Sequence, residues 1–203
     1  MDFFTLLIQV LNAVQYGLLL FLVAAGLTLI FGMMGIINLA HGSFYMIGAY
    51  LSFGLAPIVA QTIDGGFLGT LVVGLISAIF LGYLLEWLFY SYLYERDHLQ
   101  QVLMTYGLIL VFEEVRSLLL GDDVHSVAIP AWLSASIQLG DIMTYPIYRL
   151  FISGICLLLA AAMLIVLTKT RLGMMIRAGS VNREMTQSLG VNIQFLYRLV
   201  FAS

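Results

Sequence analysis

The feature that most constrains this chain is a long run near its start that carries no ionisable charge. No Asp, Glu, Lys or Arg occurs from Phe3 to Ile63, a stretch of 61 residues. As a single helix this stretch would be about 90 Å long, about three times the thickness of a hydrocarbon core. The chain must therefore reverse or break inside the stretch, and it must do so without a charged loop.

The overall composition places the whole chain in a lipid bilayer. Hydrophobic residues make up 62% of the 203 residues and charged residues only 9%, with a mean hydropathy of +1.05. A soluble domain carries about 25% charged residues. The predicted fold is an all-α, polytopic transmembrane helix bundle that forms one domain over residues 1–203. The net charge of −3 gives no basic surface, so nucleic acid is not an expected partner.

Apolar runs predict five complete spans and the start of a sixth. The complete spans are expected near residues 6–31, 43–60, 67–90, 102–120 and 150–168. The sixth begins near residue 195 and is cut off at residue 203. Glu86 lies near the inner end of its span, where we expect an interfacial position or an interhelical hydrogen bond.

The distribution of positive charge predicts the orientation of the bundle. Segment 169–194 contains Lys169 and three arginines, whereas segment 121–149 contains only Arg149, at its far edge. The positive-inside rule therefore places 169–194 in the cytoplasm and 121–149 outside. Counting spans back places the N-terminus outside, unless a re-entrant segment reverses that last step.

Segment 32–44, GMMGIINLAHGSF, is the expected place for a broken or re-entrant element. Three glycines, an asparagine and a histidine interrupt an otherwise apolar run. Irregular backbone survives in lipid only where it is buried in protein or lines a wet cavity. The candidate residues of a substrate path are Gly32, Gly35, Asn38, His41, Gly42, Ser43 and Tyr45.

Two alternatives for this segment stay open at the level of the sequence. Asn38 and His41 could hydrogen-bond neighbouring helices and hold the break in shape without touching a substrate. The segment could also be an ordinary interfacial turn.

The cytoplasmic segment 169–194 carries signals for a short helix. Asn182 can cap it, Glu184 lies in its first turn, and Gly190 occupies the position of a left-handed C-terminal cap. A helix of about two turns is marginal alone, so we expect it to pack against something. It could lie on anionic lipid or dock onto a cytoplasmic partner.

The sequence has no signature of catalysis or of cofactor binding. The only lysine, Lys169, is not part of a G-x-x-x-x-G-K motif, so the chain has no phosphate-binding loop. No His, Cys or carboxylate cluster has metal-ligand spacing. We therefore expect a chain that is not an enzyme and holds no metal or cofactor. Any energy source must come from another subunit.

Three segments together resemble one protein family. "GLTLIFGMMGIINLAHGSFYMIGAY" (26–50), "TYGLILVFEEVRSLLLG" (105–121) and "TRLGMMIRAGSVNREMTQSLGVN" (170–192) are similar to the permease subunits of branched-chain amino-acid ABC importers. Members of that family are longer, so the resemblance implies a chain that lacks their final third, a C-terminal truncation.

The resemblance also implies partners and a location. A second homologous permease, two cytoplasmic ATPase subunits and an external substrate-binding protein would assemble with this chain in a bacterial inner membrane. Segment 169–194 would be the ATPase-coupling loop, and freed backbone groups at 32–44 would meet the amino acid. The implied coupling residues are Arg177, Ala178, Arg183, Glu184, Leu189 and Gly190.

The expected function is thus a membrane-spanning permease subunit for branched-chain or related small amino acids. An alternative within the same class is a permease for urea or short amides. Alternatives of another class are an ion-coupled carrier, a passive channel, or a fragment that transports nothing. An ion-coupled carrier is expected to hold an acid in the middle of a span, whereas the acids here cluster near span ends.

Overall fold

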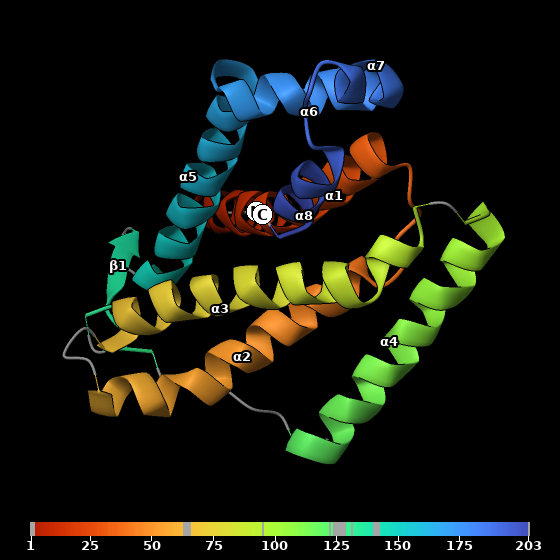
Figure 1. Cartoon of the computed structure of the whole chain (residues 1–203). Helices are drawn as coiled ribbons and strands as arrows, with labels where there is room; N and C mark the ends of the chain where they lie inside the picture. Colours follow the sequence, from red (N-terminus) through yellow and green to blue (C-terminus); the bar gives the residue numbers. More distant parts are fainter. Residues whose placement is uncertain are drawn as a thin grey trace.

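A computed structural model confirms the all-α class. It describes residues 3–62, 66–94, 96–121, 123, 129–130, 132–139 and 143–202. The described elements, in chain order, are α1 (Phe3–Met34), α2 (His41–Thr62), α3 (Gly66–Leu88), the 3₁₀ helix η1 (Tyr90–Tyr92), α4 (His98–Leu120), β1 (Ser136–Leu139), β2 (Met143–Pro146), α5 (Ile147–Lys169), α6 (Arg171–Val181), α7 (Arg183–Ser188) and α8 (Ile193–Ala202) (Figure 1).

Four of the five predicted spans are long and apolar enough to cross a membrane. They are Thr5–Met34, His41–Val59, Gly66–Tyr92 and Ile147–Lys169. The fifth prediction, 102–120, falls on α4. That helix has 23 residues, but Glu113, Glu114 and Arg116 in its second half lower its hydropathy. Among the described residues the structure thus has four candidate spans, and α4 is a further long helix at the fifth predicted position that carries three charged side chains. The predicted start of a sixth span is the short apolar helix α8.

The break predicted at 32–44 is confirmed and is narrower than expected. α1 continues through Met34, and α2 begins at His41, so residues 35–40 alone are non-helical. Gly35 has a φ of +69°, a left-handed conformation that glycine adopts without steric cost. Its amide still donates to the Phe31 carbonyl at 2.9 Å, which closes the last turn of α1.

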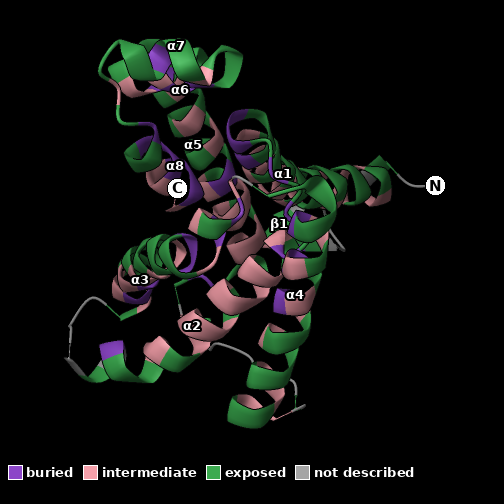
Figure 2. Ribbon diagram, turned by 45° about the vertical axis from the view of Figure 1, so that its right-hand side comes forward, coloured by how far each residue is buried: buried purple, intermediate pink, exposed green. Residues whose placement is uncertain are grey.

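The helices are arranged around the end of α1 that precedes the break. α2 packs along α3, α5 packs on α1, and α8 lies against α3 and α1. The helices α6 and α7 lie together at one end of the molecule, while α4 extends away from α2 and α3 (Figure 1). Much of the long helices is exposed (Figure 2), as expected for surfaces that face lipid.

The buried core is small and lies where the break, η1, α6 and α8 meet. Its fully buried side chains include Ile36, Tyr90 and Leu196, each no more than 1% exposed. The same cluster takes in the last turn of α1 and Ile176 of α6. The tightest packing in the described chain therefore surrounds the break.

A short antiparallel hairpin on the segment predicted to lie outside was not expected from the sequence. β1 pairs with β2 from Ser136 opposite Pro146 to Leu139 opposite Met143. Trp132, just before the hairpin, packs edge-to-face on Phe151 of α5 with ring centroids 5.7 Å apart, and on Phe67 of α3 at 6.4 Å. These aromatic contacts fix the segment to α3 and α5.

The helix α6 was also not expected, because two glycines weaken its helix propensity. Thr170 caps it by accepting a hydrogen bond from the Gly173 amide at 3.2 Å. A Cβ at Gly173 would lie 2.3 Å from the carbonyl oxygens of Val166 and Leu167. The sharp corner between α5 and α6 therefore requires glycine at position 173.

We predict that Gly173→Ala destabilises this corner by about 1–3 kcal/mol, since the methyl group meets backbone rather than a movable side chain. Thermal unfolding of the purified protein in detergent measures the effect. Gly154→Ala in α5 is the matched control, because its added Cβ would meet nothing within 4 Å. Equal melting temperatures for the two variants would show that the corner is not as tight as described.

Candidate functional site

Asn38 holds the break between α1 and α2 in shape. Its side chain is 3% exposed, and its Oδ1 accepts two hydrogen bonds, from the Ala40 amide at 3.0 Å and from the Tyr90 hydroxyl at 2.8 Å. The first bond forms the local turn that asparagine favours. The second joins the break to η1, 52 residues later. Asn38 therefore turns the chain and also fixes its position against the core.

Tyr90 is the residue that donates to Asn38 and so fixes the break against the core. The sequence alone did not single it out. The side chain is fully buried, and its ring packs against Phe201 of α8 with centroids 4.4 Å apart. Phe44 of α2 lies 6.1 Å from the same ring. The only hint in the sequence is chemical: a buried asparagine in a span needs a partner. Nothing in the sequence identifies which residue provides it.

His41 joins the first turn of α2 back to α1. Its Nε2 lies 3.0 Å from the Val23 carbonyl oxygen, so this nitrogen carries a proton and donates. Gly26 permits the approach, since a Cβ there would lie 3.2 Å from the imidazole ring. His41 thus ties the residues after the break to the helix before it.

A cavity of about 190 Å³ opens beside His41, between α1, α2, α3 and α8. Its walls include Phe44 and Leu51 of α2, Leu85 of α3 and Phe201 of α8, and His41 is the one polar side chain among the lining residues. Asn38 Nδ2 and His41 Nδ1 are both buried and have no hydrogen-bond partner among the described residues. The break therefore offers one unused donor and one unused acceptor.

The other predicted path residues are placed differently. Gly35 forms the turn, and Gly42 and Ser43 lie in the first turn of α2, where the Ser43 amide donates to the Ala40 carbonyl at 2.9 Å. Tyr45 is 63% exposed and lines no part of this cavity. Gly32 lines a separate, apolar groove of about 570 Å³ between α1, α5 and α6, together with Arg177.

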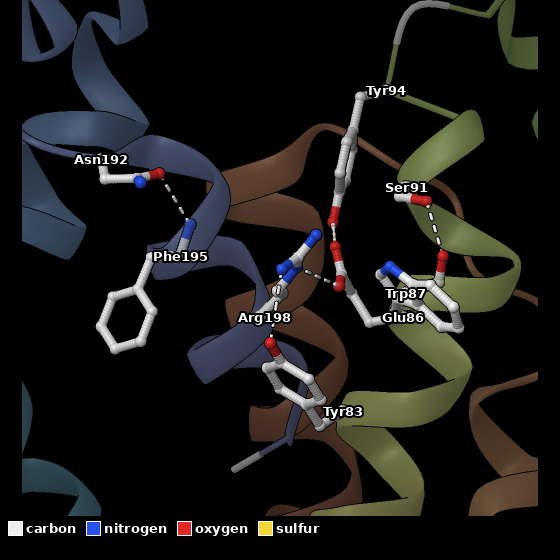
Figure 3. A network of polar contacts seen from close by, with 8 residues as sticks. All are labelled: Tyr83, Glu86, Trp87, Ser91, Tyr94, Asn192, Phe195 and Arg198. Atoms are coloured by element: carbon white, nitrogen blue, oxygen red, sulfur yellow. Dashed lines mark hydrogen bonds and ion pairs between the residues drawn. The ribbon is translucent and has the colours of Figure 1, made fainter.

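A second polar cluster joins α3 to α8 close to the break (Figure 3). Glu86 is 1% exposed, and its Oε2 pairs with Arg198 Nε at 3.1 Å while its Oε1 accepts from the Tyr94 hydroxyl. Arg198 also donates to the Tyr83 hydroxyl at 3.3 Å. The interhelical bond expected of Glu86 is confirmed. Arg198 and Tyr94 were missed, although a buried acid in a span predicts that a cation exists.

The electrostatics of this cluster keep Tyr94 protonated. Burial and the adjacent Glu86 carboxylate both raise the pKa of the Tyr94 hydroxyl well above its ordinary range. The hydroxyl is therefore a donor to Glu86 at any physiological pH.

The helix predicted in segment 169–194 is confirmed as α7. The Asn182 side chain accepts from the Met185 amide at 2.9 Å, Glu184 lies in the first turn, and Gly190 has a φ of +85°. Leu189, Met185 and Val181 are 76%, 62% and 88% exposed.

The predicted coupling residues fall into two groups. Five of the six are exposed, as expected for residues that meet a partner: Arg177, Ala178, Glu184, Leu189 and Gly190. Arg183 instead turns inward: its Nη2 donates to the Met34 carbonyl at 3.3 Å, and its guanidinium lies 5.0 Å from the centroid of the Tyr197 ring.

We predict that Asn38→Ala lowers the unfolding free energy by about 1–3 kcal/mol, because it leaves the buried Tyr90 hydroxyl and the Ala40 amide without their acceptor. Tyr90→Phe, which removes one hydrogen bond, should cost about 1 kcal/mol. Unfolding of the protein in mixed detergent micelles measures both losses. Leu39→Ala, at a 46% exposed position in the same break, is the control and should lose less. A loss as large as that of Asn38→Ala would contradict the role given to Asn38.

Comparison with known proteins identifies the family. The family model described as "Branched-chain amino acid transport system / permease component" matches residues 9–203. The high-affinity branched-chain amino acid transport system permease protein BraD of Pseudomonas aeruginosa is 26% identical over 203 residues, which cover 95% of this chain and 65% of that protein. The corresponding permease protein LivH of Escherichia coli strain K12 is 28% identical over 209 residues, with coverages of 98% and 67%.

The matches cover nearly all of this chain but only part of each relative. The chain spans about two thirds of the length of the curated relatives it matches. No solved structure matches it. The family model, however, covers nearly all of the chain, including the break and the α6–α7 segment. The chain therefore belongs to the family of branched-chain amino acid transport system permease components.

Proposed function

We propose that this chain is a membrane-spanning permease subunit of an ATP-binding-cassette importer for branched-chain or related small amino acids. The observation that carries the proposal is the position of α7. A short capped helix with exposed apolar side chains lies on the segment predicted to be cytoplasmic, and its first residue contacts the end of α1 beside the break. Such a helix can pass the motion of an ATPase to a transport path.

The cavity beside His41 supports an amino acid with an aliphatic side chain as the substrate. Its walls are apolar and carry no charged side chain, so they suit a branched alkyl group. His41, the one polar side chain among the lining residues, has an unused acceptor that suits the ammonium group of an amino acid. Urea or a short amide would leave the apolar walls without a partner, which makes it the weaker candidate.

The exposed apolar side chains of the loop support a partner at the cytoplasmic face. Val181, Met185 and Leu189 surround α7 and belong to the most exposed large hydrophobic side chains of the described chain. Exposed apolar side chains gathered outside the spans mark an interaction surface. We propose that a cytoplasmic ATPase subunit covers this surface.

The rest of the assembly follows from the same proposal. A second, homologous permease would complete the path, a second ATPase would serve it, and an external binding protein would deliver the amino acid. The complex would lie in a bacterial inner membrane. This chain would bind and gate, and ATP hydrolysis would take place in the partner.

We predict that Met185→Glu with Leu189→Glu abolishes co-purification of the ATPase subunit from cells that express the complete transport system. The two carboxylates would face an apolar partner surface and would cost several kcal/mol if buried without a partner. Affinity purification through this chain, followed by ATP-dependent leucine uptake in proteoliposomes, measures the effect.

Leu99→Glu is the matched control, because Leu99 is 70% exposed at the start of α4, on another segment. It should leave the ATPase bound. Recovery of the ATPase with the double variant would remove α7 as the docking site. Failure of the unaltered complex to take up leucine in an ATP-dependent manner would refute the importer itself.

A further inference from the structure

We propose that Arg183 is the positioning residue that joins the cytoplasmic loop to the break, so that α7 and residues 35–40 move as one unit. The proposal rests on the proposed importer function and deepens it. It assigns Arg183 a role inside this chain, at the end of α1, instead of a contact with the ATPase.

The first contact is with the backbone at the end of α1. Arg183 Nη2 donates to the Met34 carbonyl oxygen at 3.3 Å, across 149 positions of sequence. Met34 is the last residue of α1, so its carbonyl has no partner within the helix. The last turn of α1 has no basic residue of its own. Arg183 therefore brings both a donor and a positive charge to the negative end of a 32-residue helix.

The second contact is with α8. The Arg183 guanidinium lies over the ring of Tyr197, which is 2% exposed. The Tyr197 ring packs in turn on the Tyr94 ring, with centroids 4.8 Å apart. Tyr94 donates to Glu86, and Glu86 pairs with Arg198 (Figure 3). Arg183 therefore stands at one end of a continuous row of contacts from α7 through α8 to α3.

The helix before α7 is attached at the same place. Gly179 of α6 is buried, and a Cβ there would lie 3.4 Å from the end of the Met33 side chain and 3.5 Å from Ile193. Met33 is the neighbour of Met34 in the last turn of α1. The loop thus meets α1 through two adjacent residues, one by apolar packing and one by the Arg183 hydrogen bond.

This arrangement has a mechanical consequence. Gly35 follows Met34 directly and begins the non-helical residues 35–40. A displacement of α7 must either carry the Met34 carbonyl with it or break the Arg183 bond. Because the bond has a charged donor in a half-buried setting, its loss should raise the opening frequency of the break about tenfold or more.

The test uses the complete complex in lipid nanodiscs and proteoliposomes, with Arg183→Gln and Arg183→Lys compared with the unaltered protein. Hydrogen–deuterium exchange of the amides at 35–40 reports on the break without ATP. Leucine transported per ATP hydrolysed reports on coupling. Arg171→Gln is the matched control, since Arg171 is exposed at the start of α6 and its side chain makes no hydrogen bond or ion pair with the described residues.

We expect Arg183→Gln to raise exchange at 35–40 about tenfold and to lower leucine transported per ATP by a similar factor. Arg183→Lys, which keeps a cation within reach of the carbonyl, should restore most of both. The control should match the unaltered protein. If Arg183→Gln does not assemble, Arg183→Lys alone is compared with the unaltered protein and with Arg171→Gln. Its rise in exchange and its loss of leucine transported per ATP should then be less than about tenfold but larger than those of Arg171→Gln.

Three results would overturn the proposal. Unchanged exchange and unchanged coupling in both variants would show that the Arg183–Met34 contact neither stabilises the break nor transmits the motion of α7. Faster exchange with unchanged coupling would make Arg183 a structural residue only. Lost coupling with unchanged exchange would place its action at the partner surface. An unaltered complex that hydrolyses ATP without transporting leucine would count against the importer function. The exchange measurement would still show whether Arg183 stabilises residues 35–40.

Discussion

The whole arrangement depends on one requirement, that backbone polar groups within a bilayer find partners inside the protein. Residues 35–40 are non-helical between two long apolar helices. The Gly35 amide and the Ala40 carbonyl still bond to the flanking helices, whereas other backbone groups of the break need partners elsewhere. The Asn38 side chain accepts from the Ala40 amide and is held by the Tyr90 hydroxyl, and the Thr105 hydroxyl of α4 lies 3.5 Å from the Ile37 carbonyl. His41 joins the start of α2 to α1, and Arg183 caps the end of α1. The break is held by its own Asn38 together with side chains from other elements of the chain, among them η1, α2 and α7.

Because these side chains meet at the break, the buried core and the proposed substrate cavity lie in the same part of the molecule. The buried core surrounds the break, whereas the long helices beyond it present apolar side chains outward. A break that is held by distant segments is also a break that those segments can move. The proposed substrate cavity, the Glu86–Arg198 pair and the α7 helix all lie next to this core. A small shift of the loop can therefore reach the path through direct contacts.

The sequence predicts the parts of this arrangement that depend on local chemistry. The absence of charge over 61 residues located the break, and Asn182 and Gly190 located both ends of α7. Contacts between distant segments could not be predicted from one sequence. The acid Glu86 implied a partner but not Arg198, and Arg183 looked like the other exposed arginines of its loop. The helix α6 escaped prediction because its packing on α1 overrides two glycines. Whether Asn38 and His41 contact substrate stays a prediction.

The measurement that tests the central claim most directly is a set of spin-label distances in the complete complex. Labels at Ser188 on α7, Leu39 in the break and Leu158 on α5 occupy exposed positions, and Cys156→Ala removes the one native thiol. The account predicts that, on ATP binding, the 188–39 distance stays constant while both positions shift relative to 158. A change in the 188–39 distance with a constant 39–158 distance would contradict it.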